Sequence, residues 1–367
     1  MALTADYAIG TFTFPRGWFM VAESSEVTQK PLAVRYFGQD LALFRGHSGR
    51  VILLDAYCPH MGTHFVKNAT SYVIHDGQVE GDSLRCPYHA WRFGPDGKCN
   101  HIPNHTGSIP TAARVRSWPL IEAFGAVFVW HDPEGGDPEW AAPSLPEYGQ
   151  PGWVPWTFDH LGTLACHPQE VIDNIADYAH LGPVHGSTVE WYRNEFHGHR
   201  AVQYQGGGHR TLVSTGGAAP TLSTDTTYHG PGFLLSYMSG FYESIIYIAH
   251  TPVDDGLIKV WHGLLVKCAQ DVPTAEDITN ARSYQEMSRL AFAQDFDVWA
   301  NKRPAQTILQ TSADGPFHKA RIWYKQFYNP RAQREQFRKQ VEGTVYQVPS
   351  VPPHRPTACL DRTPDGT

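Results

Sequence analysis

The stretches CPHMGTH (residues 58–64) and RCPYHAWRFGPDGKC (residues 85–99) each contain a cysteine, a proline directly after it, and a histidine two or three positions beyond the cysteine. Zinc is the simplest metal for two thiolates and two imidazoles, but structural zinc sites usually carry paired thiolates on one arm. Here Cys58 and His60 form one arm, and Cys86 and His89 form the other. Two matched Cys/His arms therefore favour a binuclear metal centre over a zinc finger.

The binuclear centre that fits this ligand set is the Rieske [2Fe–2S] cluster, in which two cysteines hold one iron and two histidines hold the other. Gly62, Gly94 and Gly97 lie close to the ligands, so we expect both arms on loops between strands, where backbone N–H groups can hydrogen-bond the cluster sulfurs. His64 and Cys99 are also near, but the four better-spaced positions suffice. We therefore predict a Rieske site and keep zinc as the alternative.

Length and composition describe an ordinary globular protein with room for two domains. The 367 residues are 41% hydrophobic and 18% charged, with a formal charge of −7. The net charge and the lack of a long Lys/Arg run argue against nucleic acid as a partner. No secretory signal and no apolar run of about 18 residues is visible, so we expect no membrane span and a cytoplasmic protein. The six cysteines (58, 86, 99, 166, 268 and 359) are then expected to be thiols.

Secondary-structure patterns predict an all-β module followed by an α+β domain. The segment 132–156 has six prolines and four glycines, which indicates a boundary between domains at 1–140 and 141–367. We expect one helix over 167–182, ended by Gly182 and Pro183, and a second over 283–302. The basic segment 331–340 is expected to be a solvated helix, with a docking patch for an acidic partner as the alternative. The expected strands cover residues 32–37, 41–45, 51–57, 126–132, 232–238, 243–250 and 257–266, and the Pro-rich segment 348–367 is expected to be irregular.

A second metal site is suggested by the stretch DNIADYAHLGPVH (173–185). On a continuous helix Asp177 and His180 share one face, and a chain turn at 182–183 would let His185 point back toward His180. Two imidazoles and one carboxylate, with open positions left, form the facial triad of non-haem Fe(II) oxygenases. An isolated H-x₄-H is more often two structural histidines, but a Rieske cluster in the same chain favours iron, since a one-electron relay is useful beside a metal that activates O₂.

The carboxylate ligand of this second site is chosen between two aspartates. Asp295 shares a helix face with Phe292 and Trp299 and is expected to point inward, whereas Asp297 lies on another face and is expected to be solvated. We predict Asp295 as the ligand. Asp177 can then accept a hydrogen bond from His180, fix the tautomer of that ring, and offer its second oxygen to a Rieske histidine.

Several segments of the chain resemble the oxygenase component of 3-ketosteroid 9α-hydroxylase, a Rieske non-haem iron oxygenase. In the first domain these are FPRGWFMVA, VILLDAYCPHMG, CPYHAWRFGPDGKC, ARVRSWPL and VFVWHDPEG, and in the second EVIDNIADYAHLGPVH, DFDVWANK and DGPFHKARIWYKQFY. The resemblance implies a helix-grip catalytic domain and a head-to-tail homotrimer in which one subunit's cluster serves its neighbour's iron. It implies cluster ligands Cys58, His60, Cys86 and His89, iron ligands His180, His185 and Asp295, and Asp177 bridging to His89.

By this resemblance the chain is a terminal monooxygenase that uses O₂ to hydroxylate a hydrophobic polycyclic substrate, expected to be a 3-ketosteroid. No G-x-G-x-x-G follows a strand, so electrons are expected from NADH through a separate ferredoxin-type reductase. Alternatives within the class are sterol desaturation, aromatic dihydroxylation and O- or N-demethylation. A Rieske ferredoxin and a zinc-stabilised structural protein are the alternatives outside it.

Two segments depart from the family pattern. Residues 61–85 make the spacing between His60 and Cys86 longer than in that family, which affects the surface around the cluster. Residues 186–208 fit the family poorly where substrate access is expected. The nearby aromatic residues Tyr178, Trp191, Tyr192 and Phe196 are equally well explained as core and as pocket lining.

Overall fold

The computed structural model describes residues 2–208 and 221–348, and these divide into two compact units. The smaller unit comprises residues 19–138, and the larger one comprises residues 1–18 together with 139–367. The first 18 residues thus pack with the larger unit, although the sequence analysis placed them in the first domain. Their polar contacts explain this, since the Thr4 N–H donates to Asp255 at 2.8 Å and Asn329 Nδ2 donates to the Ile9 carbonyl at 2.9 Å.

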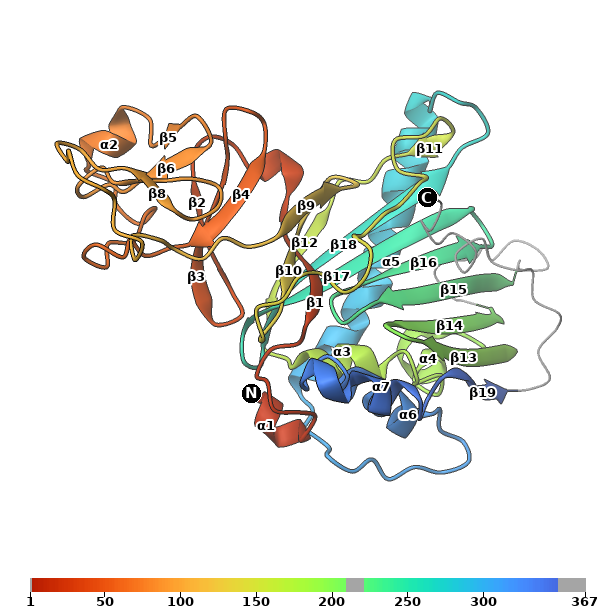
Figure 1. The fold of residues 1–367 in the computed structure, drawn as a ribbon. Coiled ribbons are helices and arrows are strands. Elements are labelled where there is room, and N and C mark those ends of the chain that lie inside the picture. Colours follow the sequence, from red (N-terminus) through yellow and green to blue (C-terminus); the bar gives the residue numbers. More distant parts are fainter. Residues whose placement is uncertain (1, 209–220, 349–367) are drawn as a thin grey trace, which may run out of the picture. The chain divides into compact units, whose positions relative to one another are not determined.

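The smaller unit is built from three small antiparallel sheets (Figure 1). The strands predicted in it are present, and short strands that had not been predicted surround the second Cys/His arm. The first sheet contains β1 (Gly17–Glu23), β10 (Ala126–His131) and β9 (Leu120–Ala123); the second β2 (Leu32–Tyr36), β3 (Gln39–Arg45) and β4 (Val51–Asp55); the third β5 (Val79–Glu80), β6 (Ser83–Arg85), β7 (Arg92–Phe93) and β8 (Cys99–His101). The remaining elements of this part are the helix α2 (Tyr72–His75) and the 3₁₀ turn η1 (Ser24–Glu26).

The larger unit is a nine-stranded antiparallel sheet with one long helix against it. Figure 1 shows this helix, α5 (Ala275–Ala300), running across the sheet, and it contacts β18, β11 and β12. This arrangement confirms the predicted α+β class, an all-β first unit followed by a helix-grip domain. In order, the sheet contains β11 (Trp153–Val154), β18 (Leu257–Lys267), β17 (Ser244–Asp254), β16 (Phe233–Ser239), β15 (Leu222–His229), β14 (Arg200–Gly207), β13 (Trp191–His197) and β19 (Gly343–Val348), and β12 (Asp159–Leu164) also pairs with β18.

The shorter helices gather near one end of this sheet (Figure 1). Their core contains Trp323, Tyr324 and Tyr328, which are fully buried with Ile172 and Ala176. The aromatic residues of α6 therefore hold α3 and the N-terminal segment in place. These helices are α1 (Thr4–Tyr7), α3 (Pro168–Asp173), α4 (Leu181–His185), α6 (Phe317–Lys325) and α7 (Arg334–Arg338), with the 3₁₀ turn η2 (Arg331–Gln333) before α7.

The single helix predicted over 167–182 is wrong. The helix α3 ends at Asp173, residues 174–180 form turns, and α4 begins at Leu181. Pro183 lies in the first turn of α4, where a backbone N–H has no intrahelical partner to lose, so the Gly182-Pro183 pair begins a helix rather than ending one. Asp177 and His180 consequently lie in a turn between two helices and not on one helix face.

The helix α5 begins eight residues earlier than predicted, because a capping box starts it. The Thr274 hydroxyl accepts a hydrogen bond from the Asp277 N–H at 3.1 Å, and the Asp277 carboxylate accepts one from the Thr274 N–H at 2.8 Å. The buried face of this helix includes the polar residues Gln285, Ser288 and Asp295. Burying polar side chains costs free energy unless each has a partner, and the partners of these residues are described with the site below.

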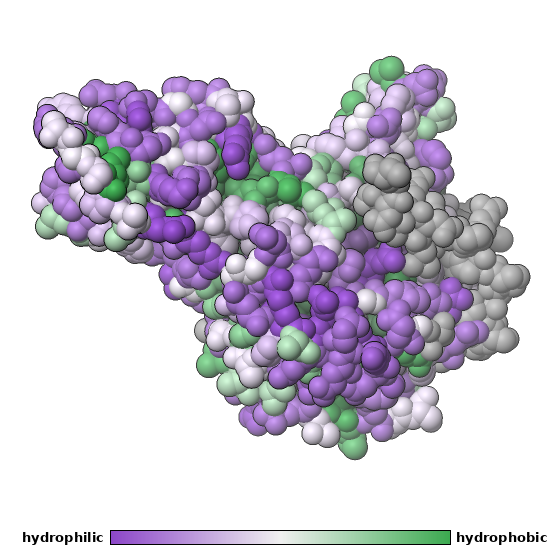
Figure 2. Space-filling view, in the orientation of Figure 1, coloured by the Kyte–Doolittle hydropathy of each residue, from purple (hydrophilic) through white to green (hydrophobic). Residues whose placement is uncertain are grey.

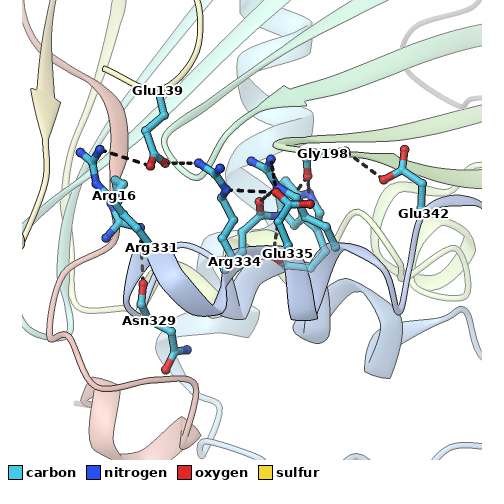
Figure 3. A network of polar contacts seen from close by, with 11 residues as sticks. Arg16, Glu139, Gly198, Asn329, Arg331, Arg334, Glu335 and Glu342 are labelled. Atoms are coloured by element: carbon cyan, nitrogen blue, oxygen red, sulfur yellow. Dashed lines mark hydrogen bonds and ion pairs between the residues drawn. The ribbon is translucent and has the colours of Figure 1, made fainter. Parts of the chain in front are cut away.

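The basic segment 331–340 is not the freely solvated helix that we expected. Arg331 and Arg334 both pair with Glu139, at 3.3 and 2.9 Å (Figure 3). Arg338 donates to the Gln326 side chain at 2.7 Å. Three of its arginines are thus engaged in ion pairs or hydrogen bonds within the larger unit.

The surface seen in Figure 2 is mostly hydrophilic, with scattered hydrophobic side chains. In residues 2–208 and 221–348, no helix is long and apolar enough to cross a membrane. The segment predicted to be irregular, 348–367, lies outside the described residues except for Val348.

Candidate metal centres

The two Cys/His arms are two loops with the same backbone hydrogen-bond pattern. In the first, the Gly62 N–H donates to the Cys58 carbonyl at 2.9 Å and the Cys58 N–H donates to the Thr63 carbonyl at 2.9 Å. In the second, the Ala90 N–H donates to the Cys86 carbonyl at 3.0 Å and the Cys86 N–H donates to the Trp91 carbonyl at 2.7 Å. The fourth residue after each cysteine has a positive φ, 73° at Gly62 and 57° at Ala90. Ala90 holds a conformation that favours glycine, which is typical of functional loops.

The four candidate ligands separate by depth. Cys58 and Cys86 are each 2% exposed, whereas His60 and His89 lie at the surface with ring centroids 4.7 Å apart. The His60 ring stacks on Trp91, with centroids 4.2 Å apart, which fixes its orientation. The hydrogen bond from the Cys58 thiol lowers the pKa of Cys86 and raises the pKa of Cys58. Inner thiolates and outer imidazoles fit a Rieske cluster.

The geometry disfavours a single zinc ion at these four residues. The ligand atoms of a tetrahedral zinc site all lie within roughly 4 Å of one another, given Zn–S and Zn–N bonds of about 2.0–2.3 Å. Across the part of the chain that the structure describes, groups of three or more possible ligands within 4.8 Å are limited to His180, His185 and Asp295. The two loops therefore suit a cluster whose two irons are held by different residues.

His64 and Cys99 have other contacts near the cluster loops. His64 Nδ1 accepts hydrogen bonds from the backbone N–H groups of Val66 and Lys67 at 3.0 and 3.1 Å. The Cys99 thiol is buried and lies 3.5 Å from the His101 carbonyl. Both residues thus have structural roles of their own.

The second centre brings together His180, His185 and Asp295, as the sequence analysis predicted. Asp295 Oδ1 lies 3.4 Å from His185 Nε2 and 3.9 Å from His180 Nε2. Asp295 is buried on α5, whereas Asp297, the alternative ligand, is exposed. A buried carboxylate facing two imidazole nitrogens is a donor set that suits Fe(II), and the three residues leave coordination positions free. The residues present therefore fit a mononuclear iron.

Both histidines of this group are held by hydrogen bonds at Nδ1. His180 Nδ1 hydrogen-bonds to the backbone carbonyl of Asp177, and His185 Nδ1 lies 3.0 Å from Gln294 Oε1. Because a carbonyl can only accept, Nδ1 of His180 carries the proton and Nε2 keeps its lone pair for a metal. Gln294 was missed in the sequence analysis, and its position next to Asp295 is the signal that could have found it.

Asp177 contacts His180 in three ways. Its carboxylate Oδ1 accepts from the His180 backbone N–H at 3.2 Å, its Oδ2 lies 3.6 Å from Nδ1, and its carbonyl takes the shorter contact to Nδ1. Partial burial raises the pKa of Asp177, but the hydrogen bonds from His180 outweigh it and hold that pKa below the usual range. Asp177 is thus an ionised carboxylate directly behind the candidate iron site.

A cavity of about 760 Å³, counting its part open to solvent, is bounded at one side by His185 and Asp295. Eight of its sixteen lining residues are apolar, five of them aliphatic side chains of the sheet, and Phe292 of α5 adds an aromatic ring. The other eight are polar or charged. The aliphatic residues include Leu222, Leu234, Met238, Ile246 and Ile248.

The four aromatic residues considered from the sequence do not line this cavity. Tyr192 and Phe196 are fully buried, and Tyr178 packs against Tyr192 with ring centroids 5.2 Å apart. Trp191 packs over Gly206, where a β-carbon would lie 2.4 Å from its indole ring. Tyr192 and Phe196 therefore belong to the core, and Tyr178 and Trp191 are partly buried beside other residues.

Comparisons with known proteins agree with both centres. The Rieske [2Fe-2S] domain model matches residues 17–119, and the 3-Ketosteroid 9alpha-hydroxylase C-terminal domain model matches residues 129–328. A probable 3-ketosteroid-9-alpha-monooxygenase oxygenase component from Rhodococcus rhodochrous is 33% identical, covering 89% of this chain and 82% of the relative. The cholesterol 7-desaturase of Caenorhabditis elegans is 28% identical, covering 86% of this chain and 77% of the relative.

Solved structures share the fold at low identity. NdmA of Pseudomonas putida CBB5 with caffeine superposes with a TM-score of 0.67 at 18% identity, covering 89% of this chain and 95% of that one. Dicamba monooxygenase bound to dicamba superposes with a TM-score of 0.60 at 19% identity, covering 90% of this chain and 99% of that one. Fold and site together define a Rieske-type non-haem iron oxygenase component. Within that class, the chain belongs to the family of 3-ketosteroid 9α-hydroxylase oxygenase components.

Proposed function

We propose that this chain hydroxylates a 3-ketosteroid, inserting one oxygen atom of O₂ into a C–H bond. The observation that carries the proposal is that a cavity with an aliphatic patch is lined by His185 and Asp295 as well. A wall of this kind suits a hydrophobic ring system and places it beside the metal ligands. Relatives named as 3-ketosteroid-9-alpha-monooxygenase components support the steroid class.

A polar group in the cavity supports a ligand that carries a ketone. The Thr224 side chain is buried, and its hydroxyl has no hydrogen-bond partner among the described residues. An unsatisfied buried hydroxyl is unfavourable unless a ligand or water completes it, and a ketone oxygen can accept from it.

His180, His185 and Asp295 are proposed to hold the iron, and Cys58, His60, Cys86 and His89 are proposed to hold the cluster. When bound, Fe(II) activates O₂ and the [2Fe–2S] cluster transfers single electrons. Each turnover consumes two electrons and two protons, and releases one water with the hydroxylated product. The Asp177 carbonyl keeps the His180 lone pair on Nε2, and the cavity wall keeps the substrate beside the ligands.

The electron supply and the assembly are part of the same proposal. We infer that a separate ferredoxin-type reductase passes electrons from NADH to the cluster, since the sequence has no dinucleotide-binding fingerprint. The exposed imidazoles of His60 and His89 suit electron transfer across a protein surface. A homotrimer in which Asp177 of one subunit contacts His89 of the next would connect the two centres.

A single turnover tests the activity without the natural reductase. Iron-replete protein is chemically reduced without air, freed of reductant, and mixed with 4-androstene-3,17-dione and ¹⁸O₂. A product that carries one labelled oxygen supports the proposal, and the Asp295→Ala variant should give none. Reoxidation of the cluster with unchanged steroid would contradict the 3-ketosteroid assignment.

Sterol desaturation is the second candidate, because a cholesterol 7-desaturase is 28% identical over 353 residues. The same experiment with cholesterol distinguishes the two. A product two mass units lighter, without label, would favour desaturation over hydroxylation.

A further inference from the structure

One hydroxyl on the cavity wall is tied to a buried histidine and an aspartate. Ser288 of α5 lines the cavity, and its Oγ lies 3.0 Å from Nε2 of His262 on β18. Nδ1 of His262 lies 2.8 Å from Oδ2 of Asp159 on the edge strand β12. His262 is 0% exposed and Ser288 is 3% exposed, so the hydrogen bond between them is shielded from solvent, whereas the Asp159 side chain is 26% exposed.

The direction of these hydrogen bonds follows from the groups around Asp159. The Gln285 side-chain nitrogen donates to Asp159 Oδ2 at 2.9 Å and to the Thr157 carbonyl at 2.7 Å. Burial raises the pKa of Asp159, but the hydrogen bonds from His262 and Gln285 lower it below the usual value. The ionised carboxylate accepts from Nδ1–H of His262. With Nδ1–H directed at Asp159, Nε2 is the ring nitrogen left to accept, so we assign the Ser288 hydroxyl as its donor.

Because the hydroxyl proton of Ser288 is donated to His262, the Ser288 oxygen can only accept a hydrogen bond from a group in the cavity. The other charged groups near the pair are Glu286 and Arg289 of α5, which bind each other at 2.5 Å. A second pair of cavity hydroxyls, Thr226 and Ser236, bond to one another at 2.7 Å. Ser288 therefore differs from its neighbours in having a fixed acceptor character.

We propose that Ser288, oriented by His262 and Asp159, accepts a hydrogen bond from a hydroxyl group of the substrate. This inference rests on the proposed steroid function and adds to it a preference for a steroid that carries a hydroxyl group. Ser288 precedes Asp295 by seven residues, about 10 Å along the helix axis. The hydroxyl is thus bound at a distance from the oxidised carbon, and this remote contact selects which C–H bond faces the iron.

The test measures binding of three steroids that differ only at position 17. The ligands are 17β-hydroxyandrost-4-en-3-one, androst-4-ene-3,17-dione and androst-4-en-3-one, titrated calorimetrically into the metal-loaded protein. We expect the hydroxysteroid to bind about 5- to 10-fold more tightly than the 17-deoxy compound, as one hydrogen bond allows. Ser288→Ala should abolish the preference, and Ser288→Cys should weaken it.

Thr279→Ala is the control on the same helix, since it removes an exposed hydroxyl that does not line the cavity. It should keep the preference, and thermal unfolding of every variant checks that each is folded. A hydroxyl preference that survives in Ser288→Ala would overturn the inference and leave the steroid function standing. A preference for the 17-ketone would overturn the acceptor role. Failure of all three steroids to bind the natural sequence would overturn the steroid function, and the inference with it.

Discussion

His180 hydrogen-bonds through Nδ1 to the backbone carbonyl of Asp177, while the Asp177 carboxylate Oδ2 lies further away, at 3.6 Å from the same nitrogen. The main chain therefore fixes the tautomer of His180, and the carboxylate is available for another partner. The sequence analysis expected the Asp177 carboxylate to orient His180. In the structure, the Asp177 carbonyl makes the shorter contact to the His180 ring.

This relationship predicts a separation between iron binding and turnover in Asp177→Ala. Because the carbonyl remains, the variant should keep mononuclear iron, while turnover with reductase should fall roughly 10- to 100-fold. Iron analysis and steady-state assays measure the two effects. Equal loss of iron and activity would show that the carboxylate is needed to hold the metal. Asp297→Ala, at an exposed position of α5, is the control for both.

Asp295 and Asp297 make a matched pair for the proposed iron ligand. Asp295→Ala should lose the mononuclear iron and keep the cluster absorbance, because the buried carboxylate between two imidazoles is removed. Asp297→Ala should keep both. Iron-to-sulfide ratios check this, and full iron in Asp295→Ala with loss in Asp297→Ala would reverse the assignment.

The cluster ligands can be tested against their neighbours. Cys86→Ser should remove the visible absorbance and the acid-labile sulfide of the cluster, whereas Cys99→Ser, a buried thiol outside the two matched loops, should keep them. His64→Ala should also keep the cluster, since His64 is engaged with backbone N–H groups. Colourless natural protein that contains zinc would rule out the Rieske assignment.

Gly97 provides a prediction about stability near the cluster. Its φ is 76°, and a β-carbon there would lie 2.1 Å from the Val115 carbonyl. Gly97→Ala should destabilise the fold by about 2–4 kcal/mol, from backbone strain and the clash together. Gly49 has a φ of 90° with no atom within 4 Å of the added carbon, so Gly49→Ala should lose only about 1 kcal/mol. Denaturant unfolding measures both, and equal losses would mean that the clash is relieved.

Gln294 tests how the second histidine is held. Its side-chain oxygen lies 3.0 Å from His185 Nδ1, so Gln294→Ala should weaken iron binding about 10-fold. Competition with a chelator gives the affinity. Gln294→Glu keeps an acceptor and should retain tight binding; weak binding by both variants would point to a packing effect instead.

The fold class and the motifs of the proposed cluster ligands were predictable because the signal is local. Cys58, His60, Cys86 and His89 lie within short motifs, and the strand before Cys58 is a continuous apolar run, whereas the short strands beside Cys86 and His89 have none. The helix over 167–182 was predicted wrongly because a proline in a first turn and a proline after a last turn look alike in sequence. The N-terminus of α5 was missed although Thr274 and Asp277 form a capping box.

Other features could not be read from the sequence because they join distant segments. Asp159, His262 and Ser288 come from two strands and a helix that are far apart in the chain, and none has a motif around it. The ion pairs of Glu139 with Arg331 and Arg334 likewise join the two ends of the larger unit. Basic spacing alone suggested a solvated helix there, since the partner lies almost 200 residues away.

The helix α5 carries both Ser288 and Asp295 on its buried face. Successive residues of an α-helix are rotated by about 100°, so inserting or deleting one residue between these positions would turn one of them away from the cavity. Under the proposed roles, oxygenases of this family could therefore change the carbon they attack by whole-turn changes in this segment, with the cavity wall unaltered. Regiochemistry would then be encoded in the length of one helix.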